Sequence, residues 1–214
     1  LKYNLPVIPV TILLRLAGLF VYLGATWRAI RWLPFGKWVL VVLALAPMAL
    51  FAAATVNMDG FNNAVSFLFI ALVLRCGMQK GRPLGWWEVL GVSGLSILLG
   101  LSKPGAVLIL PQLLLLAWVP MKSKWQTGVV ILGVLMAVGL TVGWNTLALS
   151  GSHFDAGGEQ SAGRQLDLIF AAPFAFLGSF IQGNLIRLGG IFQDWVGVYG
   201  HWVGEVPAAV YILY

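Results

Sequence analysis

A carboxylate and three amides lie together between two apolar runs, in the segment Asn-Met-Asp-Gly-Phe-Asn-Asn at residues 57–63. The Asp-Gly pair is typical of a tight turn, and Asn62 is suited to cap a following helix. The same oxygens are also suitable ligands for a divalent cation or partners for sugar hydroxyls. A turn alone and a turn that binds both fit this pattern. The binding candidates are Asn57, Asp59 and Asn63, with Asp59 as the candidate metal ligand.

Two isolated basic residues have the chemistry to bind a phosphate. Lys103 lies in the turn Ser-Lys-Pro-Gly at residues 102–105, between the apolar runs 85–101 and 105–119. These runs form helices of about 25 and 22 Å at 1.5 Å per residue, shorter than the apolar layer of about 30 Å. The turn is therefore expected near phosphate depth. Arg15 lies inside the first apolar run, where charges usually face protein or a cavity. Snorkelling to ordinary headgroups is the alternative for both residues.

The longest polar stretch, residues 150–167, contains His153, Asp155, Glu159 and Arg164. It lacks the two-histidine metal spacing, the phosphate-binding glycine pattern and the nucleophile elbow. A solvated loop is the simplest interpretation. His153 and Arg164 are the substrate-binding candidates within it.

The composition requires lipid as solvent for much of the chain. Of 214 residues, 60% are hydrophobic and 9% are charged, whereas soluble domains carry about a quarter charged residues. The net charge of +6 comes from scattered pairs of basic residues, which excludes nucleic acid as a partner and leaves membrane lipids. The single Cys76 excludes a disulfide framework and a cysteine metal cluster.

The apolar runs are long enough for transmembrane helices and lack the alternation of a β-barrel strand. We therefore predict an all-α, polytopic transmembrane bundle with about seven spans and an external juxtamembrane segment. We expect spans and short loops over 1–149, an external loop with an interfacial helix near 173–187 over 150–205, and the start of a further span over 206–214. The chain begins with Leu1 and ends inside an apolar run, so both ends are expected to be truncated. The runs lie at 8–30, 38–56, 61–76, 85–101, 105–119 and 126–148, followed by a broken run at 168–186 and one from 206.

The basic residues predict the orientation of these spans. Positively charged loops face the cytoplasm, and tryptophans gather at membrane boundaries. One set of loops has most of the basic residues, namely Arg28, Arg31, Lys37, Arg75, Lys80, Arg82, Lys122 and Lys124. Seven tryptophans lie near these loops, namely Trp27, Trp32, Trp38, Trp86, Trp87, Trp118 and Trp125. The opposite loops have every acid except Glu88. We expect the acidic face, with all the candidate site residues, to be external.

Three short motifs in this order resemble a bacterial membrane-protein family, domain of unknown function 2142. They are the run Leu45–Phe51, the polar segment 57–63 and the turn 102–105, and the resemblance extends over about residues 10–205. The family is similar to the C-type glycosyltransferases, which transfer a sugar from a polyprenyl-phosphate donor to an acceptor at the outer face of the membrane. The resemblance implies a multi-pass protein of the bacterial cytoplasmic membrane.

The same resemblance implies roles for individual residues. Asp59 matches the position of an acid that assists donor or metal binding, so a divalent metal ion is the implied cofactor. Lys103 and Arg15 would contact the phosphate of a polyprenyl-phosphate-linked sugar donor. The catalytic acid is expected upstream of Leu1.

The leading hypothesis is therefore a membrane glycosyltransferase-like protein that acts on lipid-linked sugars in cell-envelope glycan assembly. A transporter or flippase for a lipid-linked glycan is the first alternative, and it predicts charged or broken helices near the bilayer midplane. A non-catalytic membrane scaffold is the second, and it predicts no pocket that joins Asp59 to Lys103.

Overall fold

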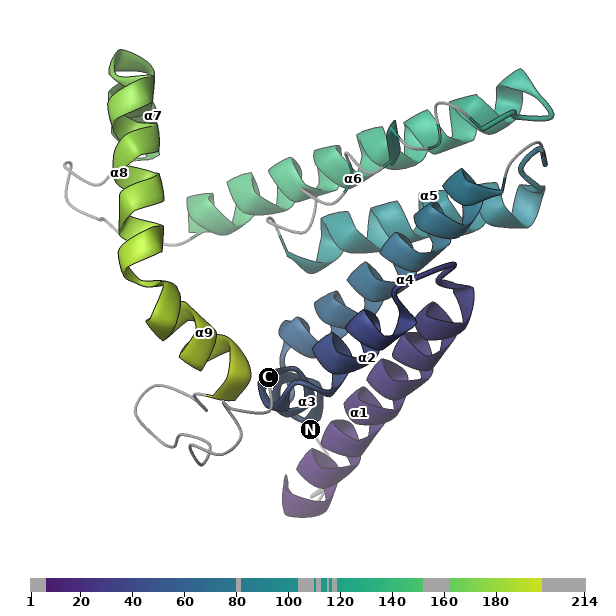
Figure 1. The fold of residues 1–214 in the computed structure, drawn as a ribbon, viewed down its shortest axis with the longest axis horizontal. Helices are drawn as coiled ribbons and strands as arrows, with labels where there is room; N and C mark the ends of the chain where they lie inside the picture. Colours follow the sequence, from purple (N-terminus) through teal and green to yellow (C-terminus); the bar gives the residue numbers. More distant parts are fainter. Residues whose placement is uncertain are drawn as a thin grey trace. The chain divides into compact units, whose positions relative to one another are not determined.

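The computed structural model describes residues 7–79, 82–103, 110, 113, 114, 116, 119–151 and 162–197, with backbone alone at 145, 148–151, 162–166 and 194–197. All the named elements in these ranges are helices (Figure 1). The chain divides into two compact units, the first ending at Thr146 and the second beginning at Leu147. The first unit contains α1 (Val7–Trp32), α2 (Lys37–Leu45), α3 (Pro47–Ala54), α4 (Met58–Met78), α5 (Trp86–Ser102) and most of α6 (Lys124–Gly151).

The all-helical class is confirmed for the described residues, but the expected seven spans are not supported. Three helices are long and apolar enough to cross a membrane, Val7–Trp32, Met58–Met78 and Lys124–Trp144, and a fourth span results if α2 and α3 are counted as one. The helix α5 has 17 residues and is about 25 Å long, short of the apolar layer of about 30 Å. The expected spans at 105–119 and from 206 lie mostly or wholly outside the described residues.

The run 38–56 is a broken helix and not a continuous span. Its two halves, α2 and α3, meet at an angle of 60°. Ala46 has ψ 134° because the residue before a proline is disfavoured in the helical conformation, and Pro47 has no N–H for the helical ladder. The break leaves carbonyl groups without helical donors. The buried Tyr22 hydroxyl donates to the Ala44 carbonyl oxygen at 2.8 Å. A side chain of α1 thus supplies a hydrogen-bond donor to a carbonyl group beside the break.

The helices α1 and α4 form the centre of the first unit and run in the same direction. Tyr22 and Ala64 lie in one core cluster with Ala44 and Ala53. Ala29 and Ala71, each two turns further along its helix, lie in another. Small residues permit this close packing.

Glycines mark the closest approaches between helices. A Cβ added at Gly60 would lie 2.9 Å from the Ala52 carbonyl oxygen, and one at Gly100 would lie 2.7 Å from the Ala137 Cα. The α4 start thus lies against α3, and the α5 end lies against α6. By contrast, Gly94 has nothing within 4 Å of an added Cβ, so no described neighbour packs closely against α5 at this residue.

The contacts between α4, α5 and α6 define two ends of the first unit. Leu72 of α4 lies against Gly91, near the α5 start, while the Ser102 hydroxyl at the α5 end reaches α4 near its start. The two helices are therefore antiparallel. Ser93 donates to the Val129 carbonyl oxygen and Thr141 to the Gly100 carbonyl oxygen, so α5 and α6 are parallel.

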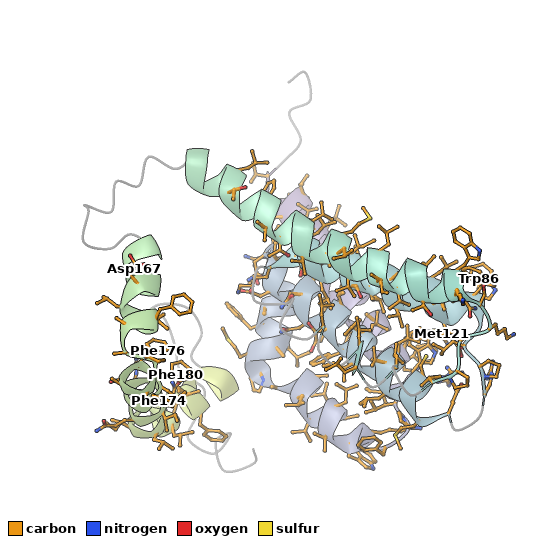
Figure 2. The ribbon with its side chains drawn as sticks, turned by 90° about the horizontal axis from the view of Figure 1, so that it is seen from above. Trp86, Met121, Asp167, Phe174, Phe176 and Phe180 are labelled. Atoms are coloured by element: carbon orange, nitrogen blue, oxygen red, sulfur yellow. The ribbon has the colours of Figure 1, made fainter. Side chains whose placement is uncertain are left out.

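We call one end of the unit the tryptophan end, where α1 and α4 finish and where α2, α5 and α6 begin. Trp86 and Met121 lie together there in Figure 2. Two arginines stack on tryptophan rings, Arg28 on Trp32 at 4.6 Å and Arg31 on Trp27 at 4.3 Å. The basic residues from which the orientation was predicted, where they are described, all belong to this end; Lys80 and Trp118 lie outside the described ranges. Which side of a membrane this end faces remains a prediction.

The second unit contains α7 (Ala162–Ala171), α8 (Pro173–Ile186) and α9 (Leu188–Gly197). The broken run 168–186 therefore consists of the last residues of one short helix and the whole of the next. Apolar side chains of α8, among them Phe174, Phe176 and Phe180, are exposed (Figure 2). A helix thus occupies the range 173–187, while its position at a membrane interface remains a prediction.

Candidate functional site

The polar segment 57–63 forms the start of α4 and not a tight turn. Asn57 is the N-cap in an extended conformation, and its Oδ1 accepts hydrogen bonds from the Asp59 N–H at 3.0 Å and the Gly60 N–H at 3.5 Å. Our expectation of a turn at the Asp-Gly pair, with Asn62 as cap, is therefore wrong. Asn57 has the capping role because its side chain satisfies amides that have no helical acceptor. The Asp59 carboxylate then lies in the first turn, where the helix dipole favours a negative charge.

Asp59 and Lys103 are in direct contact. The Lys103 ammonium lies 2.8 Å from Asp59 Oδ1. Lys103 directly follows the last residue of α5 and Asp59 begins α4, so the antiparallel packing of these helices brings the two residues together. The Lys103 side chain is 58% exposed and the Asp59 side chain is 50% exposed. An ion pair this accessible contributes about 0–1 kcal/mol to stability, and both charges remain reachable by a ligand.

A second polar contact lies beside this ion pair. The Ser102 hydroxyl donates to Asn62 Oδ1 at 2.8 Å and to the Leu99 carbonyl oxygen at 3.0 Å. Sequence reasoning missed Ser102 and Asn62 as members of the site because it assigned them to a turn and a cap. Their presence in the same two motifs as Lys103 and Asp59 was the available signal. We call Asn57, Asp59, Asn62, Ser102 and Lys103 the polar cluster.

The remaining candidates are not brought into the polar cluster by any described contact. Asn63 is half-buried on α4, and Arg15 is exposed on α1; no ion pair in the described residues joins Arg15 to Asp59. His153 lies outside the described residues, and only the backbone of Arg164 is described, in α7 of the second unit. Their proposed contribution to substrate binding is untested.

The metal hypothesis for Asp59 is also untested. No group of three or more His, Cys, Asp or Glu side chains gathers within the described ranges. The Lys103 ammonium contacts Asp59 Oδ1, so a cation at that oxygen would have to displace it. The apolar groove along α6, discussed below, is lined by neither residue.

Long apolar helices with the polar cluster at one end, and all the described tryptophans of the first unit except Trp144 at the other, are typical of a helical membrane protein. The model of the predicted membrane protein family DUF2142 matches residues 3–214, and the chain belongs to this family. The family description states no activity. No curated protein matches the chain. No solved structure matches it either.

Proposed function

We propose that this protein binds and processes lipid-linked sugars at the external face of the bacterial cytoplasmic membrane, as a glycosyltransferase-like protein of cell-envelope glycan assembly. The observation that carries the proposal is the contact between Lys103 and Asp59, with the Ser102–Asn62 hydrogen bond beside it. A cation, a carboxylate, an amide and a hydroxyl thus lie together at the end of the unit opposite the tryptophan end. Such a set matches a phosphate attached to a sugar.

Each charge has a defined part in this proposal. The Lys103 ammonium exchanges the Asp59 carboxylate for a phosphate oxygen of a polyprenyl-phosphate sugar and stabilises the charge on the departing phosphate. Asp59, once released, accepts a hydrogen bond from a sugar hydroxyl or binds a divalent cation. The proposal assigns no described side chain as the general base that removes the proton from the acceptor hydroxyl.

A transfer assay in isolated membranes tests these roles through Asp59→Asn and Lys103→Gln. Removing a group that stabilises the transition-state charge costs about 10²–10³-fold in rate, and this loss is expected for Lys103→Gln. Lys37→Gln removes an exposed lysine from the tryptophan end and should leave the rate unchanged. Full turnover in both site variants would contradict the assignment.

A charge swap separates binding from simple structural pairing. The double variant Asp59→Lys with Lys103→Asp retains an ion pair between α4 and the end of α5. If the pair serves only to join the helices, the swap restores activity. Under our proposal it does not, because the ammonium no longer follows the α5 end and the carboxylate no longer begins α4.

The broken pair α2–α3 favours a lipid-linked glycan flippase as the second candidate. Broken helices are common at the binding sites of transporters, and the angle here is 60°. However, the Tyr22 hydroxyl already satisfies the Ala44 carbonyl oxygen, which leaves that oxygen less available to a substrate. A flipping assay with a fluorescent lipid-linked sugar in proteoliposomes distinguishes the candidates: a flippase moves the probe without an acceptor, whereas a transferase consumes it only with one.

A further inference from the structure

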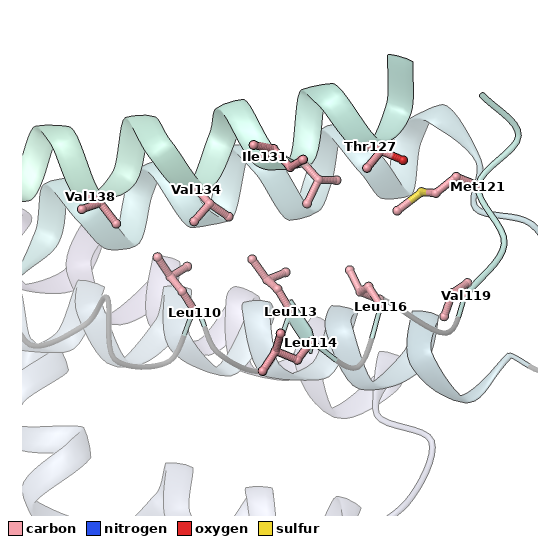
Figure 3. Close-up of a pocket in the computed structure, with 11 residues that line it drawn as sticks. Leu110, Leu113, Leu114, Leu116, Val119, Met121, Thr127, Ile131, Val134 and Val138 are labelled. Atoms are coloured by element: carbon pink, nitrogen blue, oxygen red, sulfur yellow. The ribbon is translucent and has the colours of Figure 1, made fainter. Parts of the chain in front are cut away.

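An apolar groove of about 720 Å³ runs along α6 in the first unit. Figure 3 shows Leu110, Leu113 and Leu116 on one side, facing Val134 and Val138 of α6 on the other. Met121 and Thr127 lie at one end and Val138 at the other. Thr127 alone among the lining residues has a polar side chain; the full lining is Leu110, Leu113, Leu114, Leu116, Val119, Met121, Thr127, Val130, Ile131, Val134 and Val138.

The groove lies along a helix that is long and apolar enough to cross a membrane. Only 17% of the apolar window of Lys124–Trp144 is buried, so most of this candidate span is open to lipid. Thr127 and Val138 are 11 positions apart, which corresponds to about 16 Å of helix. One leaflet of an apolar layer of about 30 Å has nearly this thickness. The groove thus has the length of one acyl chain in a single leaflet.

Two lysines mark one end of the groove. Lys122 follows Met121, and Lys124 precedes Thr127 by three residues, so both exposed lysines lie at the end where these two lining residues are found. Neither lysine takes part in an ion pair with another described residue.

A hydrogen-bond chain holds this charged end in place. The Lys122 N–H donates to Gln126 Oε1 at 2.8 Å, and the fully buried Gln126 side chain donates to the Leu84 carbonyl oxygen at 3.2 Å. Trp125, which directly precedes Gln126, is 80% exposed, as expected for a residue at headgroup depth. The charged end is therefore fixed to the α5 start and does not depend on a free loop.

We propose that the groove is a specific site for an anionic phospholipid, with one acyl chain along α6 and the phosphate between Lys122 and Lys124. The charge of the lysines complements an anionic headgroup, and the aliphatic lining complements the chain. This site lies at the tryptophan end, opposite the polar cluster, and is independent of the proposed sugar chemistry.

Native mass spectrometry of the purified chain tests the headgroup. Phosphatidylglycerol should be retained in preference to phosphatidylcholine with the same acyl chains. The exposed-residue double variant Lys122→Gln with Lys124→Gln should weaken phosphatidylglycerol binding about 30-fold, which is about fivefold for each lysine. Lys37→Gln, at the same end but away from the groove, is the charge control and should change binding less than about twofold. Equal retention of the two lipids, or a double variant within twofold of the parent, would overturn the proposal.

The acyl chain is tested by filling the groove. Val134→Trp places a bulky side chain in the lining, whereas Leu135→Trp adds the same bulk at the next residue, which is 63% exposed and outside the lining. A phosphatidylglycerol probe with a diazirine in one acyl chain should label residues 110–138 in the parent and in Leu135→Trp, but not in Val134→Trp. Uniform labelling of all the exposed spans, as for ordinary bilayer lipid, would refute a specific site.

Discussion

Replacing Tyr22 with Phe removes one hydroxyl from the centre of the first unit and keeps the ring. Tyr22 is 1% exposed, and its hydroxyl donates to the Ala44 carbonyl oxygen at 2.8 Å, beside the break between α2 and α3. Its ring is 6.4 Å from that of Phe67, a contact that Phe preserves. The substitution therefore isolates the hydrogen bond from the packing.

The expected loss of stability comes from the Ala44 carbonyl oxygen, which loses its hydrogen bond from the Tyr22 hydroxyl. A buried acceptor left without a partner costs about 1–3 kcal/mol, while hydrogen bonds between membrane helices average about 0.6 and reach about 1.7 kcal/mol. Ala44 is 2% exposed, so its carbonyl oxygen is poorly accessible to a solvent donor that could replace the hydroxyl. We therefore expect Tyr22→Phe to lower the free energy of unfolding by about 1–2 kcal/mol.

Reversible unfolding in mixed micelles, followed by circular dichroism during an SDS titration, measures this change. Thr11→Val is the matched control, because the exposed Thr11 hydroxyl donates to the Val7 carbonyl oxygen within the same helix and its loss should change stability by less than about 0.5 kcal/mol. If Tyr22→Phe matches this control, the hydroxyl does not stabilise the break and our account of it fails.

Two further predictions concern packing and orientation. Gly100→Ala places a Cβ against the α6 backbone and should lower the free energy of unfolding by about 1–3 kcal/mol, measured in the same SDS titration. Gly94→Ala is the control, because an added Cβ there has open space around it and should not destabilise the fold. Equal effects of the two substitutions would contradict the close α5–α6 contact. Met58→Cys and Trp87→Cys introduce thiols at positions that are 54% and 87% exposed, while the native Cys76 is fully buried. A membrane-impermeant maleimide should label Met58→Cys in intact cells and Trp87→Cys only after permeabilisation. The reverse labelling pattern would invert the predicted orientation.

Local properties of the chain determined the membrane character and the helical class. A run of apolar residues must satisfy its own backbone hydrogen bonds in lipid, so hydropathy alone predicts α1, α4 and α6. Pro47 marks an interruption of the run 38–56, but hydropathy does not give the 60° angle between its halves, because it responds to the apolar residues on both sides of a proline and not to its missing N–H. Hydropathy also does not distinguish a helix long enough to cross the membrane from a shorter apolar helix such as α5.

Sequence singled out Asp59 and Lys103 as separate candidates, and the tertiary structure joined them. Their contact depends on the register between the antiparallel helices α4 and α5, which is set where Gly91 of α5 lies against Leu72 of α4. Register is a property of such interhelical contacts, which no local pattern encodes. The motifs were therefore visible in the sequence, while the polar cluster and the groove along α6 were decided only by how the helices pack.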